Sequence, residues 1–124
     1  MIAKRQDNRA VRRVEVLGDL FLSISDEKSK FHGDAMNLSA NGINFLSLRR
    51  IPLFREVDVH LQLPSDDHRT RNNIHCHGVV VRCVTRVVPF FEISLFFMDL
   101  AGRDKHKIQR YMMHVVEPRP LGPR

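Results

Sequence analysis

The sequence predicts an all-β, mainly strand fold: a six-stranded antiparallel β-barrel with one C-terminal α-helix. Six segments have strand-like apolar patterns, turn residues separate them at short intervals, and only the end of the chain has a helical period. Several short strands divided by turn signals are typical of antiparallel barrels. The 124 residues, 43% of them apolar, suit one core. We therefore expect one domain over residues 1–117 and a disordered tail over residues 118–124.

The first half of the chain contains three expected strands. Residues 14–24 bury one face, because five apolar side chains share one parity: Val14, Val16, Leu20, Leu22 and Ile24. Residues 31–39 are extended again, and the apolar run GINFLSL follows Asn41-Gly42. An Asn-Gly pair between two extended segments predicts a tight hairpin.

The second half contains three more strands. Residues 56–63, EVDVHLQL, alternate without exception, and Pro64 ends that pattern. Residues 74–88 are rich in β-branched side chains and predict a strand buried on both faces. After a turn at Pro89, residues 91–97 alternate again, which predicts a sixth strand that returns along the fifth.

A helical period appears only near the C-terminus. Four apolar residues follow the spacing i, i+3, i+4 and i+7: Ile108, Tyr111, Met112 and Val115. Asp99 is a candidate cap for the start of this helix, and Pro118 and Pro120 end it. The composition of the final PRPLGPR predicts disorder.

The charge and the apolar pattern narrow the class of protein. Lysine and arginine number 20 against 14 acidic residues, which gives a formal net charge of +6 and favours phosphate-bearing partners. No apolar run approaches the roughly 20 residues that a membrane span needs, and the first residues lack the apolar core of a secretory signal. We expect a soluble cytoplasmic protein with no membrane insertion.

Neither a metal site nor an enzyme is expected. His75, Cys76 and His77, with Cys83 on the same parity as the histidines, invite a metal interpretation, but no fourth ligand is evident. Surface histidines beside reduced, buried thiols are the favoured alternative. No GxSxG, HExxH or P-loop spacing occurs, so the sequence indicates neither catalysis nor a cofactor.

Two polar constellations remain as candidate binding elements. Arg5 and Arg9 lie in the basic arm that residues 1–10 are expected to form, and a guanidinium grips phosphate or guanine bidentately. Asn37 and Ser39 are two residues apart and project to one face of a strand, where an amide and a hydroxyl hydrogen-bond a base or a phosphate. Gly42 lets a backbone or ligand approach closely. The alternatives are a solvated basic terminus and an ordinary hairpin turn.

Taken together, these two motifs resemble the PilZ family, whose domains are receptors for the bacterial second messenger cyclic di-GMP. The motifs are RxxxR ahead of the first strand and NxSxxG at a later hairpin. The resemblance extends over nearly the whole chain, through GVVVRC at residues 78–83, FEISLFFMDL at residues 91–100 and IQRYM at residues 108–112. It implies a PilZ-like barrel.

The resemblance also implies the roles of five residues. Arg5 and Arg9 match the arginines that bind phosphate and guanine and fold over the ligand, while Asn37 and Ser39 match the positions that recognise guanine and phosphate from the barrel surface. Gly42 matches the glycine that shapes the turn. The ligand is cyclic di-GMP, and no other cofactor is implied.

Two departures from the family pattern are expected to weaken binding. Asn37 replaces the commoner aspartate, so a neutral amide stands where a carboxylate accepts two hydrogen bonds from guanine. Ser94 stands where family members often carry glycine, and its Cβ crowds a ligand on the barrel face.

The function predicted from the sequence is that of a second-messenger receptor. Binding of cyclic di-GMP orders the N-terminal arm and changes a surface for an unidentified downstream protein. Two alternatives stay open: a PilZ fold without ligand that acts as a protein-interaction module, and a small basic barrel that binds RNA or single-stranded DNA. The second is disfavoured because Phe45, Phe91 and Phe97 are expected in the core rather than on a basic strand face.

Overall fold

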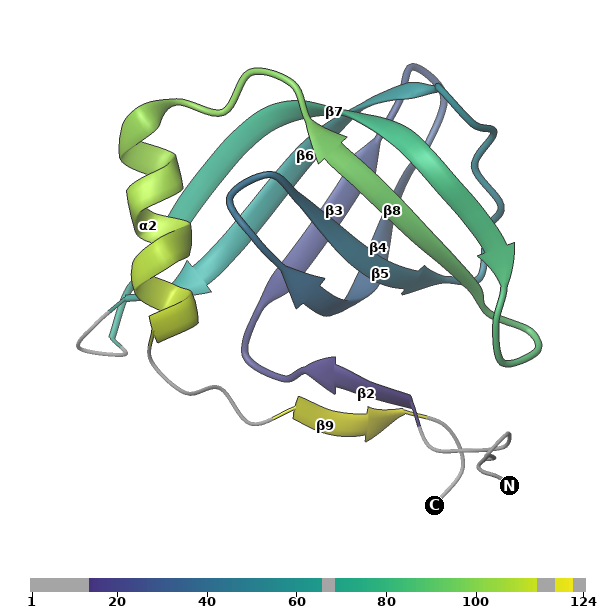
Figure 1. The fold of residues 1–124 in the computed structure, drawn as a ribbon, viewed down its shortest axis with the longest axis horizontal. Helices are drawn as coiled ribbons and strands as arrows, with labels where there is room; N and C mark the ends of the chain where they lie inside the picture. The colour runs from purple at the N-terminus through teal and green to yellow at the C-terminus, as the bar shows by residue number, and fades with distance from the viewer. Residues whose placement is uncertain (1–13, 66–68, 114–117, 122–124) are drawn as a thin grey trace.

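The computed structural model describes residues 14–65, 69–113 and 118–121. The elements are β2 (Val14–Leu17), β3 (Phe21–Ser25), β4 (Lys30–Leu38), β5 (Gly42–Ser47), β6 (Glu56–Pro64), β7 (Arg71–Thr85), β8 (Phe91–Phe97), α2 (Gly102–Met113) and β9 (Pro118–Leu121). Six strands form a closed antiparallel barrel in the order β3-β4-β5-β8-β7-β6, with α2 across one end (Figure 1). The predicted six-stranded barrel with a C-terminal helix is confirmed.

The interior of the barrel is apolar and closely packed. Inward residues of all six strands are almost completely buried, among them Ile24, Phe45, Leu61, Ile74 and Ile93. Gly33 on β4 leaves the space that the Phe45 ring fills, since a Cβ at residue 33 would overlap that ring. The predicted core positions Phe45 and Phe97 are therefore core in the structure, and Phe91 packs against it half-buried.

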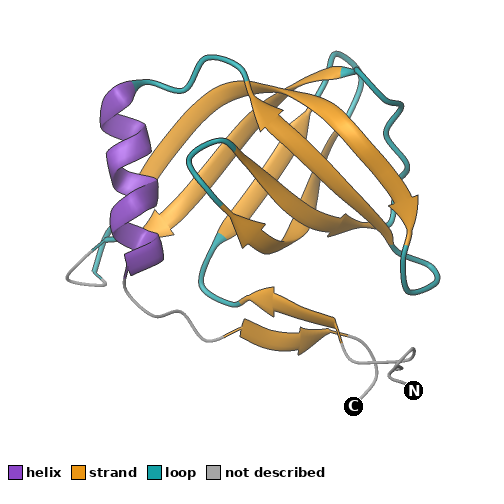
Figure 2. Cartoon of the chain, viewed as in Figure 1, coloured by secondary structure: helices purple, strands orange, loops and turns teal. Residues whose placement is uncertain are grey.

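The first predicted strand is wrong in one respect, because residues 14–24 form two strands. Gly18 and Asp19 make a turn, so β2 leaves the barrel and pairs with β9, and only β3 enters the barrel wall (Figure 2). Val16 is buried against the outside of the barrel and Leu22 inside it. Both burials follow the same alternation, so the pattern alone did not reveal the break.

The C-terminal tail also differs from the prediction of disorder, since residues 118–121 form β9. Pro120 stands opposite Glu15 and Pro118 opposite Leu17, whereas Arg119 and Leu121 stand at the alternate positions of the ribbon. Both prolines thus share one parity, and a two-stranded ribbon has only edge strands, on which proline is tolerated. Composition could not reveal a partner strand about a hundred residues away.

The helix α2 closes the barrel with a narrower apolar face than the sequence predicted. Ile108 and Tyr111 are buried, and the Tyr111 hydroxyl donates a 3.0 Å hydrogen bond to Asp19 Oδ1. Met112 was predicted on the buried face but is 44% exposed. Asp99 does not cap the helix, because its carboxylate binds His77. No helix in the described ranges is long and apolar enough to cross a membrane.

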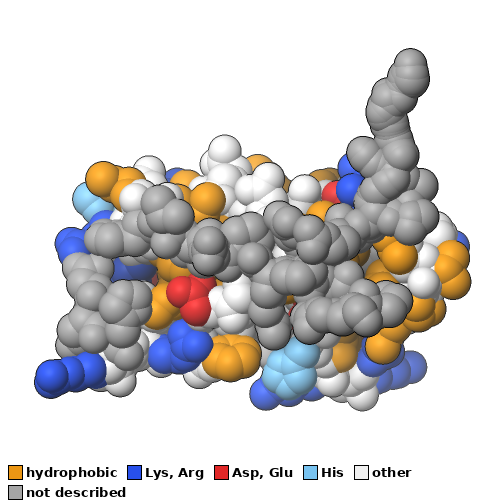
Figure 3. Space-filling model, turned by 90° about the horizontal axis from the view of Figure 1, so that it is seen from below, with side chains coloured by type: hydrophobic (Ala, Val, Ile, Leu, Met, Phe, Trp, Pro, Cys, Tyr) orange, Lys and Arg blue, Asp and Glu red, His pale blue; other side chains and the backbone are white. Residues whose placement is uncertain are grey.

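The β2–β9 ribbon covers part of the outer wall of the barrel. Val16 packs there against Leu46 of β5, together with Met36, Val87 and Phe90. Figure 3 shows the face of the molecule on which this ribbon lies. Lys and Arg side chains are spread around the edge of that face. In the sequence, the segment that carries the arginine motif directly precedes β2, the strand that packs on this wall.

Candidate functional site

The NxSxxG sequence forms the hairpin between β4 and β5. The Ser39 N–H donates to the Gly42 carbonyl at 2.9 Å, and the Asn41 N–H donates to Ser39 Oγ at 3.1 Å. The Phe97 N–H donates to the Asn41 carbonyl at 2.9 Å, which ties the hairpin to β8. The hairpin predicted from Asn41-Gly42 is present. Its backbone is hydrogen-bonded both within the turn and to β8.

Gly42 is required by a close approach of two strands. It is the first residue of β5 and stands opposite Phe96 on β8. A Cβ at residue 42 would overlap the carbonyl oxygen of Leu95, which is backbone and cannot move aside. The glycine of the motif therefore sets the distance between β5 and β8, in addition to the turn role implied by the resemblance.

A row of polar residues crosses four strands beside this hairpin. Asn37 on β4 pairs with Asn44 on β5, Asn44 with Ser94 on β8, and Ser94 with Arg82 on β7. Bulges before Asn37 and before Arg82 shift the register at both ends of the row. Ser94 Oγ donates to Asn44 Oδ1 at 2.8 Å, whereas the Asn37 side chain has no hydrogen bond to another described residue.

The structure brings three of the five predicted site residues together. Asn37, Ser39 and Gly42 line one shallow hollow of about 240 Å³. We call the residues around this hollow, on β4, β5, β7 and β8, the hairpin face. Arg5 and Arg9 lie outside the described residues.

Sequence reasoning missed the apolar side of the same hollow. Val81 and Phe96 line it together with Asn37 and Asn44, and both residues are about half exposed. Phe96 shares the parity of the polar residues Glu92 and Ser94 on β8. This position in the alternation could have indicated from the sequence that Phe96 faces outward. A phenylalanine there faces outward, unlike the core residue Phe97 beside it.

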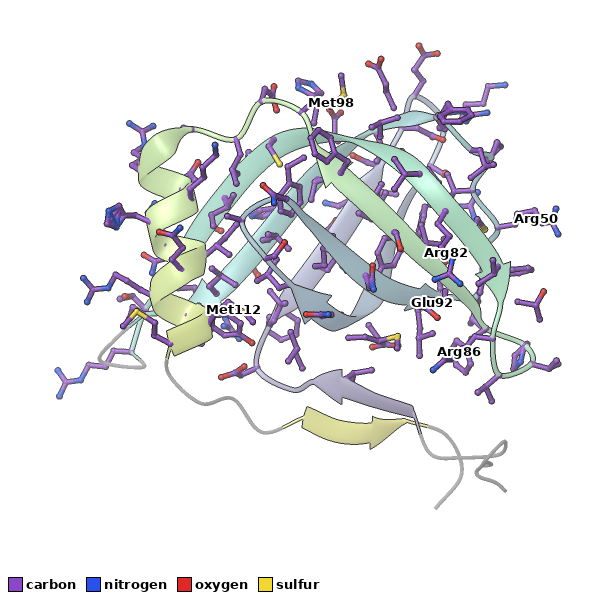
Figure 4. The ribbon with its side chains drawn as sticks, in the orientation of Figure 1. Arg50, Arg82, Arg86, Glu92, Met98 and Met112 are labelled. Carbon is purple, nitrogen blue, oxygen red and sulfur yellow. The ribbon has the colours of Figure 1, made fainter. Side chains whose placement is uncertain are left out.

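Glu92 is a buried carboxylate on the same wall. Its side chain is 8% exposed, and Oε1 lies 3.4 Å from Arg86 Nη1 without accepting a well-aligned hydrogen bond. Glu92 stands opposite Leu46 on β5 and Val84 on β7. Figure 4 shows Arg82, Glu92 and Arg86 close together along β7 and β8. This end of the wall therefore carries two guanidinium groups and one buried negative charge.

The opposite outer wall carries a cluster of histidines and aspartates on β6, β7 and the segment before α2. We call it the histidine face: Asp58, His60, His75, His77 and Asp99. The rings of His60 and His75 stack with centroids 4.1 Å apart, and His60 Nε2 lies 2.9 Å from Asn73 Oδ1. Two larger hollows, of about 450 and 980 Å³, lie on this side.

His77 is held between two carboxylates. Its Nδ1 lies 2.7 Å from Asp99 Oδ2 and its Nε2 lies 3.1 Å from Asp58 Oδ1. The hydrogen bond to Asp99, and then the negative charge of Asp99, raise the pKa of the His77 imidazole above its usual 6.5. The same hydrogen bond lowers the pKa of the Asp99 carboxyl.

The two cysteines were expected to be reduced thiols inside a strand, and both lie on β7. Cys76 is buried and Cys83 is half-buried, and both are free thiols. Burial raises the pKa of the Cys76 thiol to about 12, so it stays protonated and unreactive. Within residues 14–65, 69–113 and 118–121, no three side chains of the metal-binding types are grouped to hold an ion.

Comparison with known proteins assigns the family. The model of the PilZ domain matches residues 3–114. The chain belongs to the PilZ family. A solved structure of the Bacillus subtilis inhibitor of motility, MotI/DgrA, is similar to this PilZ domain with a TM-score of 0.68 and 19% sequence identity. The match covers 90% of this chain and 51% of that one, so this chain spans about half of its neighbour. No curated protein matches the chain.

The matched range includes the arginine motif, where the sequence offers two choices of pair. Arg5 and Arg9 have the RxxxR spacing, and so do Arg9 and Arg13. The second pair was overlooked because the first already satisfies the pattern. Arg9 is common to both pairs, and Arg13 immediately precedes β2.

Proposed function

We propose that this PilZ domain is a cytoplasmic receptor for cyclic di-GMP, which binds at the hairpin face. The observation that carries the proposal is the convergence of Asn37, Ser39 and Gly42 on one hollow. The strand that follows the N-terminal sequence, β2, packs with Val16 on Leu46 of β5, and this supports a contact between the arm and the hollow. Arg5 and Arg9 are the proposed partners of the phosphates and guanines.

The side chains in the hollow suit a guanine edge and a phosphate. The Asn37 amide offers both a donor and an acceptor, and no described side chain competes for them. Ser39 Oγ accepts from the Asn41 N–H and keeps its own hydrogen to donate. The guanidinium groups of the arm supply the positive charge that two phosphates require, since bidentate contacts of this kind are strong.

One of the two departures from the family pattern, Ser94, is hydrogen-bonded within the barrel wall. Ser94 Oγ is hydrogen-bonded to Asn44, so its hydroxyl is directed along the wall rather than into the hollow. We therefore expect Ser94 to weaken ligand binding less than the neutral Asn37 does. The ligand still meets a floor of short polar side chains.

The proposed output is a change in a protein-interaction surface. Ligand binding would order the arm against the barrel and create or hide a surface for a downstream protein. The similar solved structure is named as an inhibitor of motility, which supports an output exerted on another cellular component. The chemistry of the hairpin face requires no catalytic step.

Calorimetric titration of the purified chain tests the proposal. Cyclic di-GMP should bind saturably, whereas GMP, GTP and a short single-stranded RNA should not match it. Arg9→Ala should remove most of the affinity under either pairing of the motif, while Arg103→Ala, on the exposed side of α2, should bind like wild type. Rising salt should weaken binding, because the arginine contacts are ionic.

Three outcomes of this titration would count against the proposal. If the folded wild-type chain gives no binding heat with cyclic di-GMP, the receptor function is wrong, and the alternative of a protein-interaction module without ligand is favoured. Preferential binding of the RNA would favour the basic nucleic-acid barrel. Equal affinities of wild type and Arg9→Ala would remove the arm from the binding site. Comparing Arg5→Ala with Arg13→Ala then decides which arginine partners Arg9.

A further inference from the structure

The hollow on the hairpin face has an apolar wall that the family motifs do not include. Phe96 on β8 and Val81 on β7 line it, with 51% and 49% of their surfaces exposed. Alternation along β8 turns Phe96 outward, between the inward Leu95 and Phe97. Val81 lies at the bulge in β7 between Val80 and Arg82.

The ring of Phe96 has an open side because of its neighbour on β5. Residues directly opposite each other on an antiparallel pair normally pack side chain against side chain. The residue opposite Phe96 is Gly42, which has no side chain and admits none. Half of the Phe96 surface therefore stays in solvent, at the edge of the hollow that Asn37 and Ser39 also line.

Other exposed phenylalanines differ from Phe96 in their surroundings. The face of the Phe21 ring is occupied by the guanidinium of Arg71, whose Cζ lies 4.6 Å from the ring centroid. Phe54 is 74% exposed but lies in the connection between β5 and β6 and lines none of the described hollows. Among these three rings, only Phe96 combines an open surface with neighbouring hydrogen-bonding side chains.

We propose that Phe96 is the stacking surface for one guanine base of the bound dinucleotide, with Val81 supporting its edge. This inference rests on the proposed function. A purine offers a π-face to an aromatic ring and a row of donors and acceptors along its edge. Phe96 takes the face of the base while Asn37 and Ser39 take the edge. Such two-sided contact selects a planar base that carries guanine's polar pattern.

Stacking on Phe96 also compensates for the neutral Asn37. A base–aromatic stack changes affinity by roughly tenfold or more when the ring is removed. That gain is of the same order as the loss expected when an amide replaces a carboxylate at residue 37. Phe96 thereby sets ligand affinity through a contact that does not depend on charge.

A role in stability alone is the alternative for Phe96. An aromatic side chain opposite a glycine shields the exposed backbone of its partner strand and stabilises the pair. That role predicts a less stable protein after substitution, but unchanged ligand affinity for the folded fraction. Urea unfolding and ligand titration of the same variants separate the two roles.

The test pairs substitutions at Phe96 with the same substitutions at Phe54. Phe96→Leu keeps an apolar side chain and removes the ring, so its dissociation constant for cyclic di-GMP should rise about tenfold. Phe54→Leu should stay within twofold of wild type. The chain has no tryptophan, so Phe96→Trp also supplies a single fluorescent reporter at the hollow. Its emission should change on saturation with cyclic di-GMP, whereas that of Phe54→Trp should not.

The outcomes distinguish this inference from the proposed function. If wild type binds cyclic di-GMP and Phe96→Leu binds it equally well, the stacking role is wrong and the receptor function stands. Unchanged Phe96→Trp emission in a saturated sample contradicts stacking in the same way. If folded wild type does not bind the dinucleotide at all, the receptor function fails and the stacking role with it.

Discussion

The hairpin face and the histidine face lie on opposite sides of the barrel, and two larger hollows border the histidine face. These two hollows have volumes of about 450 and 980 Å³, whereas the hollow on the hairpin face has a volume of about 240 Å³. The polar groups of the two faces also differ. His77 is bound to two carboxylates and His60 stacks on His75, whereas Asn37 has no side-chain partner among the described residues.

This difference identifies the smaller hollow as the better candidate for a ligand. Groups that already satisfy one another gain little from a ligand, because binding must first break their contacts. An unpaired amide and an open aromatic ring lose only water when a base arrives. The state of the polar groups, rather than the size of the cavity, therefore distinguishes a binding site from a self-satisfied surface.

The largest effect is expected at Gly42. Gly42→Ala places a Cβ against the Leu95 carbonyl, so β5 and β8 must separate beneath the hollow. We expect the free energy of unfolding to fall by about 1–3 kcal/mol and affinity for cyclic di-GMP to fall more than tenfold. Urea unfolding and calorimetry measure the two effects.

Gly102→Ala is the matched control, because nothing lies within 4 Å of a Cβ at that helical position. Its stability should be unchanged or raised by about 0.5 kcal/mol, with normal binding. Normal ligand affinity in Gly42→Ala would show that the spacing of β5 and β8 does not shape the site.

An intermediate effect is expected from charge at Asn37. Asn37→Asp restores the carboxylate that is common in the family, and charge-assisted hydrogen bonds to guanine should tighten cyclic di-GMP binding about five- to tenfold. Asn73→Asp makes the same charge change beside His60, on the histidine face, and should leave affinity unchanged. Equal effects of the two substitutions would mean that net charge, rather than contact at residue 37, controls binding.

The smallest effect on ligand binding is expected at His77, which should instead give a pH-dependent stability. Its pKa is raised by Asp99, with smaller contributions from Asp58 and Glu56, so the charged imidazole stabilises the folded state. That contribution is complete below pH 6.5, the usual histidine pKa, and is lost as pH rises through the higher folded value. Urea unfolding across this range should show the loss in wild type.

The control is His77→Gln, which keeps hydrogen-bonding capacity and removes the titration. Its unfolding free energy should lack the pH-dependent component, and its affinity for cyclic di-GMP should equal that of wild type. A marked loss of affinity in His77→Gln would break the distinction between the two faces.

The barrel was predictable because most wall strands repeat one local rule. Residues 56–63 alternate inward and outward without a break, and the structure has β6 there. The expectation for residues 74–88, a strand buried on both faces, was wrong, because β7 exposes His75, His77 and Val81 on its outer face. The Asn-Gly pair at residues 41 and 42 marked the hairpin, and it lies between β4 and β5. The motif spacing also identified three residues that meet in one hollow, while the roles of Arg5 and Arg9 stay predictions.

What the sequence did not reveal depends on contacts between distant residues. Asp99 was a reasonable helix cap by position, but His77, 22 residues earlier, binds it instead. Phe96 shares the parity of Glu92 and Ser94 in the alternation of residues 91–97, and only the structure shows that Gly42 stands opposite it and that it lines the hollow. The β9 strand depends on β2 at the other end of the chain. Local periodicity carries no information about such partners.

The most direct test of the account is an amide NMR titration of the wild-type chain with cyclic di-GMP. The largest shift changes should fall on the hairpin face, at Ser39, Gly42, Ser94 and Phe96, while the amides of His75 and His77 should stay nearly unchanged. Shift changes concentrated at the two histidines, or no changes at saturating ligand, would contradict it.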